Sequence, residues 1–492
     1  MKESTAKVLL INPQRNLRNP SKQFLSIPTS LASLASFLQV NGYLVEILDT
    51  IIEDYNNWQL QPNGIYKCGL SDEEVKKRVE EFSPDFVGIS NQFTPRSSNV
   101  NRIAQVIKSV SKEITVIVGG MHATTCAEPV LDEPAIDFIV MGEAEIPFLS
   151  LLMKLRKNET DYETIPGISF TRNGEKIISK DRVILDDINI LPMPAYELID
   201  FEKYFKFCAG RDGMTTERRY ASIITSRGCP FQCSFCSSVN LWGNRWRARA
   251  PQLVVYEIEW LLKQYDIREI SIEDDNFSVA PDRLELILRE LIHRNLQFKW
   301  NTPNGVSVVN LTPDLLRLMK QSGCTRLNFG VESGDPYILH DIINKKIPFD
   351  KIKHVIRSAH KEGIITTGYF VLGMPGETIE SLERTLKFAK SLDLDEIGLN
   401  IAVPYPQTVL EQSVKKNGYL KKDASLMIAE DDIGKVVFFE TPMLSEGELL
   451  GFKNHFFKDF YKDKILKNPL YYGARALKDP SMIGRFLWKK SQ

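Results

Sequence analysis

The chain of 492 residues has few cysteines, almost no net charge and no long apolar run. Seven cysteines, odd in number and partly clustered, do not suit a disulfide framework and favour a reducing, cytoplasmic location. A formal net charge of -1 gives no electrostatic footprint for nucleic acid. Without a run of about 18 apolar residues no membrane-spanning helix is expected, and the apolar stretch after Met1 is too short for a signal peptide.

The length indicates several domains, because a soluble domain averages about 150 residues. Composition is ordinary for a globular protein, with 43% hydrophobic and 25% charged residues. From the patterns described below we predict a first domain over 1–164, a linker over 165–214, a second domain over 215–412 and a helical C-terminal region over 413–492.

Short apolar runs alternate with helical patterns in the first domain. The predicted strands are Val8–Asn12, Tyr43–Leu48, Asp85–Ser90, Thr115–Gly120 and Ile136–Met141. This alternation favours an α/β fold with a doubly wound, Rossmann- or flavodoxin-like parallel sheet, whose ligands lie beyond the carboxyl ends of the strands. The linker contains a predicted hairpin over Gly167–Ile178, with Asn173 and Gly174 at its turn.

A second alternating series fills the second domain. Its predicted strands are Ser222–Thr225, Glu269–Glu273, Phe298–Asn301, Arg326–Val331, Thr366–Leu372 and Glu396–Val403. Six strand–helix units in sequence predict a partial (β/α)6 barrel of the TIM type, in which chemistry lies at the carboxyl ends of the strands.

The C-terminal region mixes aromatic residues with lysines at helical spacing, in His455–Ile465 and again in Ile483–Lys490. Such a pattern is typical of an amphipathic helical cap that packs its aromatic face on the barrel. The alternative is contact with a hydrophobic substrate or a membrane surface.

Cys229, Cys233 and Cys236 follow the first strand of the second domain with the spacing C-x3-C-x2-C. A 4Fe-4S cluster takes four ligands, so three thiolates leave one iron open to a chelating cofactor. The alternatives are three ordinary cysteines, or a zinc site that lacks a ligand.

This spacing, with Phe235 before the third cysteine, resembles the signature of the radical S-adenosylmethionine (SAM) superfamily. The resemblance implies that SAM chelates the open iron and is cleaved reductively to a 5'-deoxyadenosyl radical. That radical takes a hydrogen atom from an unreactive C–H bond of a small-molecule or natural-product substrate. It also implies an electron donor such as flavodoxin or ferredoxin.

Glu273, Asp274, Asp275 and Asn276 end the second barrel strand. Three carboxylates at a strand end suit a ligand with an ammonium group, whereas the alternative is a cap for a helix that begins near Asp282. The resemblance implies that this strand end holds the methionine amino group of SAM. Asp274 and Asp275 match the acidic pair of the cobalamin-linked branch of the superfamily.

Later strand ends extend the resemblance. Asn328–Asp335 is similar to the Gly-x-Glu-Ser-Gly element, which makes Glu332 and Ser333 candidates for polar contacts with SAM. Phe370–Thr378 resembles the adenine-side loop, where Gly373, Pro375 and Gly376 let the backbone approach a flat ring. After the sixth strand, Gln407 stands where many relatives have glycine in Pro-Gly-Thr.

The first domain resembles the cobalamin-binding branch through Val118–Thr124 and Met141–Glu145. The resemblance implies that Gly119 and Gly120 approach the nucleotide tail of the corrin, with His122 near that tail. The remaining candidates for cofactor contact at the strand ends are Gln14, Ser90 and Glu143. The loop Asn12–Leu17 offers no histidine, so cobalamin would bind without a histidine ligand from this loop. The alternative is a degenerate module that binds no corrin.

The combined resemblance implies a cobalamin-dependent radical SAM methyltransferase that methylates an unactivated carbon of a biosynthetic substrate. A second hypothesis keeps the radical and the corrin but closes a ring or oxidises the substrate. Methylthiolation of tRNA is disfavoured because no second cysteine triplet precedes residue 200. A non-enzymatic cobalamin or redox sensor is the remaining hypothesis, and it gives no reason for a SAM site.

Overall fold

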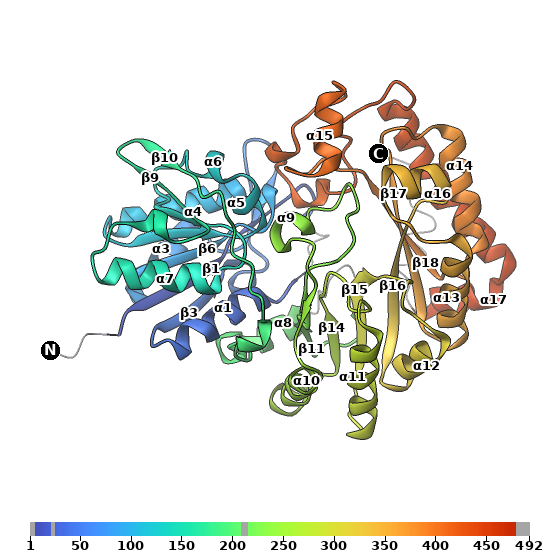
Figure 1. Cartoon of the computed structure of the whole chain (residues 1–492), viewed down its shortest axis with the longest axis horizontal. Helices are drawn as coiled ribbons and strands as arrows, with labels where there is room; N and C mark the ends of the chain where they lie inside the picture. The colour runs from blue at the N-terminus through green and yellow to red at the C-terminus, as the bar shows by residue number, and fades with distance from the viewer. Residues whose placement is uncertain (1–4, 21–24, 208–214, 479–492) are drawn as a thin grey trace.

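Two α/β units lie side by side in this computed structural model, which describes residues 5–20, 25–207 and 215–478. The first unit, coloured blue to cyan in Figure 1, contains one sheet, and the second, coloured green to orange, contains the other. The predicted fold class is confirmed: a doubly wound first sheet, a partial barrel of six strands and a helical C-terminal region.

The first sheet has seven strands in the order β10-β9-β8-β7-β6-β1-β3. Their bounds are β1 (Lys7–Asn12), β3 (Leu44–Asp49), β6 (Phe86–Ser90), β7 (Thr115–Gly119), β8 (Phe138–Val140), β9 (Ile168–Arg172) and β10 (Glu175–Ile177). The five predicted strands are present and pair in parallel. The hairpin expected in the linker is present too, and it extends this sheet through the antiparallel pairing of β9 with β8.

Helices cover both faces of the first sheet. On one face lie α1 (Thr29–Val40) and α7 (Glu145–Arg156); on the other lie α3 (Asp72–Phe82), α4 (Ser97–Val110), α5 (Met121–Thr125) and α6 (Ala127–Val130). Alternate residues of β1 divide between the two faces, since Val8 and Leu10 pack with α1 and α7 while Leu9 and Ile11 pack with α3 and α4. The short α2 (Thr50–Glu53) follows β3.

A small antiparallel sheet was missed by the sequence analysis. It consists of β2 (Arg15–Leu17), β4 (Trp58–Leu60) and β5 (Tyr66–Cys68) in the order β2-β5-β4. Each strand is only three residues long, too short for an alternating pattern to be recognised. The loop that we expected after β1 therefore continues as a strand.

The second sheet has six parallel strands in sequential order, and Figure 1 shows helices along its outer side. The strands are β11 (Tyr220–Ile223), β14 (Glu269–Ile272), β15 (Lys299–Val306), β16 (Cys324–Glu332), β17 (Ile365–Leu372) and β18 (Glu396–Ile401). The helices are α10 (Pro251–Tyr265), α11 (Pro281–His293), α12 (Pro313–Gln321), α13 (Phe349–Lys361) and α14 (Ile379–Ser391). The barrel is open between β11 and β18, as six units predict.

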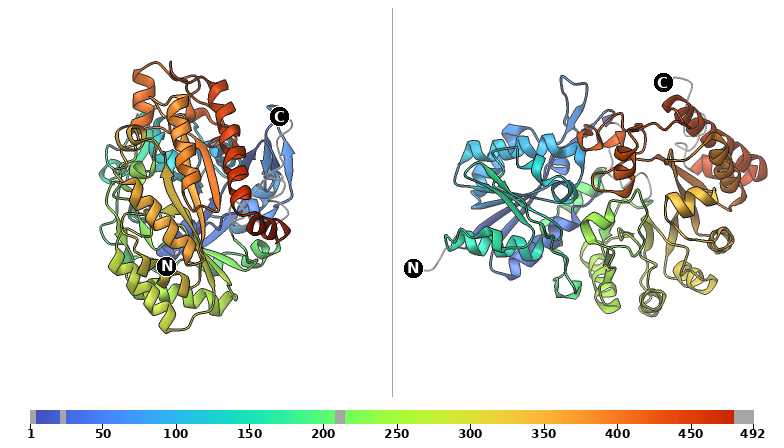
Figure 2. Two further views of the ribbon diagram at one scale, coloured as in Figure 1. Left: turned by 90° about the vertical axis from the view of Figure 1, so that its right-hand side faces the viewer. Right: turned by 45° about the horizontal axis from the view of Figure 1, so that its top comes forward.

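Further helices are α8 (Phe201–Phe207) before the barrel, and α15 (Val409–Lys416), α16 (Glu446–Lys467) and α17 (Pro469–Lys478) in the C-terminal region. The predicted aromatic cap is present, because Phe452, Phe456 and Phe460 of α16 are buried in the barrel core. The rings of Phe456 and Phe370 lie 5.6 Å apart between centroids. Since α16 lies beside β18, it covers the free edge of the sheet (Figure 2).

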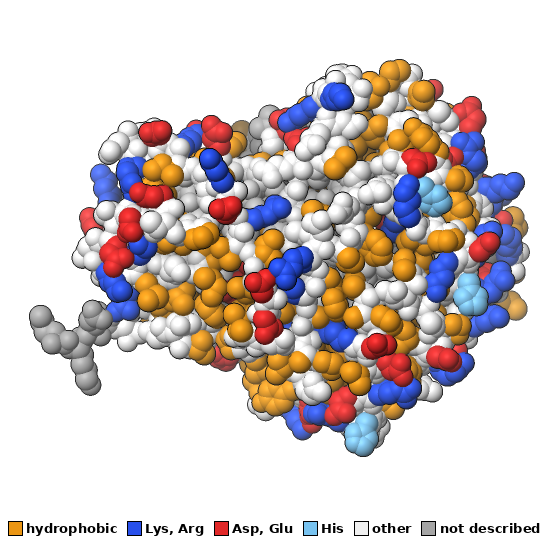
Figure 3. Space-filling model, in the orientation of Figure 1, with side chains coloured by type: hydrophobic (Ala, Val, Ile, Leu, Met, Phe, Trp, Pro, Cys, Tyr) orange, Lys and Arg blue, Asp and Glu red, His pale blue; other side chains and the backbone are white. Residues whose placement is uncertain are grey.

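The second aromatic segment, Ile483–Lys490, lies outside the described residues. None of the described helices is long and apolar enough to cross a membrane. On the face seen in Figure 3, basic and acidic side chains are interspersed, in keeping with a net charge of -1 over the whole sequence.

Candidate active site

The three cysteines lie on a loop at the carboxyl end of β11. The strands β12 (Ser226–Arg227) and β13 (Arg247–Ala248) pair in antiparallel fashion and close the base of this loop, and α9 (Ser238–Trp242) lies within it. We call residues 228–246 the cysteine loop. Ser234 fixes the loop at its centre: its Oγ and N donate to the carbonyls of Ile342 and Ile343 at 2.7 and 2.9 Å, and its carbonyl accepts from the N–H of Leu410 at 2.9 Å.

The thiols of this loop suit ligation of a cluster. Burial raises the pKa of Cys229, raises that of Cys233 to about 11 and raises that of Cys236 to about 12. Bare thiolates are therefore unfavourable here, and a cationic iron cluster would supply the missing stabilisation. Asn276 Nδ2 lies 4.0 Å from Cys229 Sγ, and the backbone N–H groups of Phe231 and Ser238 oppose the rise in the pKa of Cys229 and Cys236.

Among the described residues, no three His, Cys, Asp or Glu side chains are grouped so as to hold a single metal ion. A 4Fe-4S cluster does not require such a group, because each thiolate binds a different iron. The three cysteines therefore fit the cluster that the sequence predicted.

The two aspartates at the end of β14 differ in what they contact. Asp274 is buried and accepts three hydrogen bonds, from the N and Oγ1 of Thr225 at 2.6 Å each and from Ser226 Oγ at 2.5 Å. Asp275 accepts from the N–H of Gly228 at 3.1 Å and lines a cavity. Asp274 thus holds the segment that leads into the cysteine loop, and Asp275 is the one that faces open space.

The helix-capping alternative for this acidic strand end is wrong. The N-cap residue of α11 is Ala280, and no side chain caps that helix. Burial raises the pKa of both Asp274 and Asp275, so a cationic ligand would favour their ionised forms.

Glu332 at the end of β16 has a left-handed backbone with φ of +65° and forms a buried ion pair with Lys345 at 2.9 Å. Lys345 Nζ also donates to the carbonyl of Gly330 at 2.6 Å. A Cβ on Gly330 would lie 2.4 Å from Glu332 Oε1 and 2.7 Å from Lys345 Nζ, so glycine makes room for the pair. Ser333 is fully buried, and its Oγ lies 3.1 Å from Thr385 Oγ1.

The turn after β17 is held from within the protein. Gly373 and Met374 donate their N–H groups to the buried carboxyl of Glu377. Gly373 has φ of +87°, and a Cβ there would lie 2.6 Å from Leu449 of α16. Pro375 and Gly376 complete the turn, and Gly376 has φ of +88°. The turn thus requires glycine at Gly373 because the C-terminal region packs closely on it.

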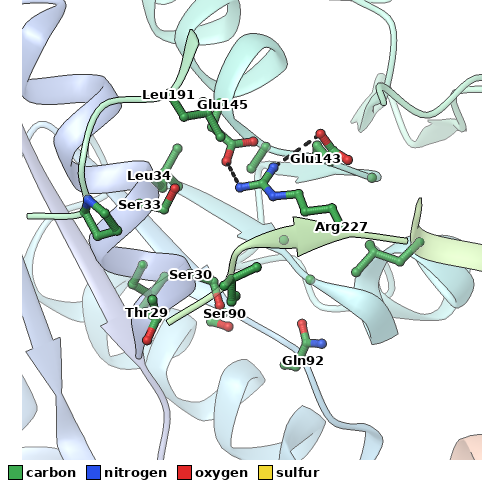
Figure 4. A pocket seen from close by; sticks show the side chains of 18 of the residues that line it. Thr29, Ser30, Ser33, Leu34, Ser90, Gln92, Glu143, Glu145, Leu191 and Arg227 are labelled. Carbon is green, nitrogen blue, oxygen red and sulfur yellow. Dashed lines mark hydrogen bonds and ion pairs between the residues drawn. The ribbon is translucent and has the colours of Figure 1, made fainter. Parts of the chain in front are cut away.

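Two cavities lie at the carboxyl ends of the strands. The larger one, about 1350 Å³, is bounded by both sheets and by the C-terminal region. Its lining includes Ser90, Arg96 and His122 of the first unit, Ser237, Glu273 and Tyr369 of the second, and Tyr405, Met427 and Glu430 beyond it. The smaller one, about 310 Å³, runs along the first sheet between α1 and the cysteine loop (Figure 4). Its lining includes Gly88, Ser90, Gly119, Gly120, Gly142, Glu143, Arg227 and Asp275.

The smaller cavity suits a ligand that lies close to the backbone, because several of its lining residues are glycines. Gly120 has φ of +110°, and a Cβ there would lie 2.8 Å from the backbone of Asn91. Gly119 also lines the cavity, and a Cβ there would have only Val140 within 4 Å, so a side chain at this position would occupy space that glycine leaves open. With Ser90 and Gln92 as polar neighbours, the lining leaves room for the nucleotide tail that the resemblance implies at this edge of the sheet.

Three further candidate residues of the first domain, His122, Glu143 and Gln14, lie in three different surroundings. His122 lines the larger cavity, and its Nδ1 lies 3.0 Å from Thr94 Oγ1; burial lowers its pKa to about 4, so the ring is neutral near pH 7. Glu143 lines the smaller cavity and is occupied by two arginines. Gln14 is buried away from both cavities and donates to the carbonyl of Leu70 at 2.9 Å.

Sequence reasoning missed the charged residues that join the units. Glu430 of the C-terminal region forms buried ion pairs with Arg15 and Arg96 of the first unit at 2.6 and 2.7 Å. Gln407, noted as a departure from the usual glycine, adopts φ of +65° and donates from Nε2 to the carbonyl of Thr125 at 2.9 Å. No local pattern announces such contacts, because their partners are hundreds of residues apart.

The open barrel carries a cysteine loop at the end of its first strand, and this loop and the doubly wound unit line one cavity. This arrangement is that of an enzyme that combines an iron–sulfur cluster with a second cofactor domain. Residues 223–389 match the model of the radical SAM superfamily, and residues 23–152 match that of the B12 binding domain. The chain belongs to the family of radical SAM enzymes that carry a B12-binding domain.

Similar proteins support this membership. The chain is 30% identical over 449 residues to cytidylyl-2-hydroxyethylphosphonate methyltransferase of Streptomyces wedmorensis, covering 85% of this chain and 84% of that protein. It is 29% identical over 392 residues to anaerobic magnesium-protoporphyrin IX monomethyl ester cyclase of Rubrivivax gelatinosus, covering 79% of this chain and 66% of that protein.

Among solved structures, the radical SAM methyltransferase TsrM from Kitasatospora setae, with tryptophan and a SAM analogue bound, shares the fold. The TM-score is 0.70 at 19% identity, and the match covers 93% of this chain and 89% of that one.

Proposed function

We propose that this protein is a cobalamin-dependent radical SAM methyltransferase that methylates an unactivated carbon of a small-molecule biosynthetic substrate. The observation that carries the proposal is the larger cavity, which Ser237 of the cysteine loop and Ser90 and His122 of the B12-binding domain line together. A substrate in this cavity would have access to both cofactor sites.

When bound, the 4Fe-4S cluster supplies the electron that cleaves SAM, and cobalamin carries the methyl group. In our proposal Cys229, Cys233 and Cys236 bind three irons, and Asp275 orients the amino group of SAM from the end of β14. Asp274 acts indirectly, since its carboxylate is occupied by Thr225 and Ser226. The pair of Glu332 and Lys345 supplies polar groups near the cysteines. Burial raises the pKa of Cys233, and the Lys345 charge opposes part of that rise.

The first unit has the complementary role in this proposal. Gly119 and Gly120 admit the nucleotide tail to the smaller cavity, and Ser90 lies where the two cavities meet. His122 is neutral, bonds to Thr94 through Nδ1 and lines the larger cavity; in our proposal it lies near cobalamin without serving as a ligand of the cobalt. Ser333 and Gln14 bond to Thr385 and Leu70 and act indirectly, and the turn with Pro375 and Gly376 stays our candidate for the adenine side of SAM. We further propose a cytoplasmic location and an electron donor of the flavodoxin or ferredoxin type.

Loading of the two cofactors tests the site assignment. Reconstituted anaerobically, the protein should show the broad absorbance of an iron–sulfur cluster, and Cys233→Ala should lose it. Cys324→Ala is the matched control, since that buried cysteine lies in β16 outside the loop. A cluster that survives Cys233→Ala at full iron content would refute the assignment.

A second pair of variants tests the corrin site. Gly119→Val should abolish binding of hydroxocobalamin, because a valine side chain at Gly119 would fill part of the smaller cavity. The variant should still fold, because a Cβ on Gly119 would make only ordinary van der Waals contacts with the protein. Gly447→Val in α16, where nothing lies within 4 Å of an added Cβ, is the control. Equal binding by both variants would show that the cofactor lies elsewhere.

The similarity to a ring-forming cyclase keeps a second candidate function in view. Both functions need the same cofactors, so products decide between them. Formation of S-adenosylhomocysteine together with 5'-deoxyadenosine supports methyl transfer, whereas 5'-deoxyadenosine alone supports cyclisation or oxidation.

A further inference from the structure

Four charged side chains meet where the B12-binding domain contacts the base of the cysteine loop. Glu143 and Glu145 follow β8, Arg227 is in β12 and Arg247 is in β13. Arg227 bridges the two carboxylates, at 3.2 Å to Glu143 and 2.6 Å to Glu145 (Figure 4), and Arg247 also donates to Glu143. We call these four residues the interdomain ion-pair cluster.

The interdomain ion-pair cluster is almost completely buried. The exposed fractions of its side chains are 0% for Glu143, 6% for Glu145, 11% for Arg227 and 5% for Arg247. Two negative and two positive charges balance, which is the condition under which buried charges are tolerated. Although burial alone would raise the pKa of Glu145, Arg227 lowers it below its ordinary value, so the carboxylate stays ionised.

The two arginines hold both strands that close the cysteine loop. Arg227 stands two residues before Cys229, and its guanidinium lies 5.5 Å from the ring centroid of Trp242 in α9. Arg247 leaves the loop on the opposite strand and also donates to the carbonyl of Leu185 at 2.7 Å. Glu143 is thus bonded to the entrance and the exit of the loop that carries the cysteines.

Three of the four side chains lie in the wall of the smaller cavity. Glu143, Glu145 and Arg227 line it together with Gly119 and Gly120. Within the described part of the chain, Glu145 Oε2 and the Nε and Nη2 atoms of Arg247 are buried without a hydrogen-bond partner. The interdomain ion-pair cluster can therefore form further hydrogen bonds, and Glu145, which has one of these unpaired atoms, borders the space for the corrin tail.

Resting on the proposed function, we propose that Glu143, Glu145, Arg227 and Arg247 are positioning residues that couple occupancy of the smaller cavity to the arrangement of the cysteine loop. A ligand that fills this cavity contacts one side of the ion-pair cluster, and the other side fixes the loop. Coupling of this kind is reciprocal: cobalamin and the iron–sulfur cluster each raise the affinity for the other by the same factor.

The coupling is measured as a ratio of dissociation constants. Hydroxocobalamin is titrated anaerobically into the full-length protein with and without the reconstituted 4Fe-4S cluster, and the ratio of the two values is the coupling factor. For the unsubstituted protein we expect a factor of at least about 5, the lower end of typical couplings. Glu145→Gln and Arg227→Lys should bring it close to 1 while each cofactor still binds alone.

Arg245→Ala is the matched control. Arg245 also joins the cysteine loop to the linker, through an ion pair with Asp186 at 2.6 Å, but these side chains are 68% and 82% exposed. An exposed pair contributes little, so this variant should keep the coupling factor of the unsubstituted protein.

A factor of 1 in the unsubstituted protein, or an undiminished factor in folded Glu145→Gln, would overturn the proposal. If both ion-pair variants fail to fold, the unsubstituted protein supplies a second measurement: at equilibrium, bound hydroxocobalamin should raise the chelator concentration that removes half of the cluster iron at least about 5-fold. An unchanged chelator concentration would equally overturn the coupling. Failure of the cofactor sites looks different, because then no form of the protein binds hydroxocobalamin or assembles a 4Fe-4S cluster. Failure of methyl transfer leaves both cofactors bound and shows only in the absence of S-adenosylhomocysteine.

Discussion

Glu430 is the acceptor of two buried arginines where the C-terminal region meets the first unit. Its carboxylate lies 2.6 Å from Arg15 and 2.7 Å from Arg96, and the exposed fractions of these side chains are 3% to 8%. Glu430→Gln would remove the anion that the two buried guanidinium groups share. Breaking a buried ion pair in this way costs ~3–5 kcal/mol.

The loss is large enough for a thermal melt to detect. For a domain of 150–250 residues, 1 kcal/mol shifts the midpoint by ~2–4 °C, so Glu430→Gln should lower it by roughly 6–20 °C. Lys421→Gln is the control in the same region: Lys421 pairs with Glu440 at 2.9 Å, but the two side chains are 43% and 32% exposed, so its loss should change the midpoint little. Equal, small shifts for the two variants would refute the reasoning.

Three further predictions concern the strand ends. Gln407→Ala should lower the free energy of unfolding by ~1 kcal/mol, because alanine keeps the strained φ of +65° and loses the hydrogen bond to Thr125. Gln407→Gly also loses that bond but relieves the backbone strain, so it should be nearly neutral; chemical denaturation compares the two variants. Gly373→Ala should be destabilised by ~1–3 kcal/mol in the same assay through its collision with Leu449, and an unchanged midpoint would contradict this. Burial raises the pKa of Glu377 from 4.5 to about 8, so the folded protein holds this proton more tightly than the unfolded chain does. The resulting stabilisation is complete below pH 4.5 and is lost as the pH rises to about 8. Glu377→Gln should therefore remove this fall in the free energy of unfolding when unfolding is measured between pH 4.5 and 8.

The arrangement of strands could be predicted from the sequence because each buried strand is a compact apolar run. Val8–Asn12 and Thr115–Gly120 contain little else, and β1 and β7 were found within one residue of those bounds. The position of the cysteine loop followed from the same reasoning, since it comes directly after the first barrel strand. In a barrel of this kind, the order of strands and helices alone determines at which end of the sheet such a loop lies.

Side-chain partners could not be predicted in this way. Asp274 and Asp275 are neighbours with the same chemistry, yet one is occupied by Thr225 and Ser226 and the other faces a cavity. Alternate side chains of an extended segment point in opposite directions, and the sequence does not say which direction is inward. Arg15 and Glu430 are 415 residues apart, and only the folded chain brings them together.

The central claim is that this enzyme cleaves SAM in two ways, once as a radical precursor and once as a methyl donor. The most direct test is to incubate the anaerobically reconstituted, hydroxocobalamin-loaded protein with SAM and a strong reductant, and to quantify both products. We predict S-adenosylhomocysteine and 5'-deoxyadenosine from the unsubstituted protein, with 5'-deoxyadenosine lost in Cys233→Ala. If 5'-deoxyadenosine forms and S-adenosylhomocysteine does not, methyl transfer is contradicted.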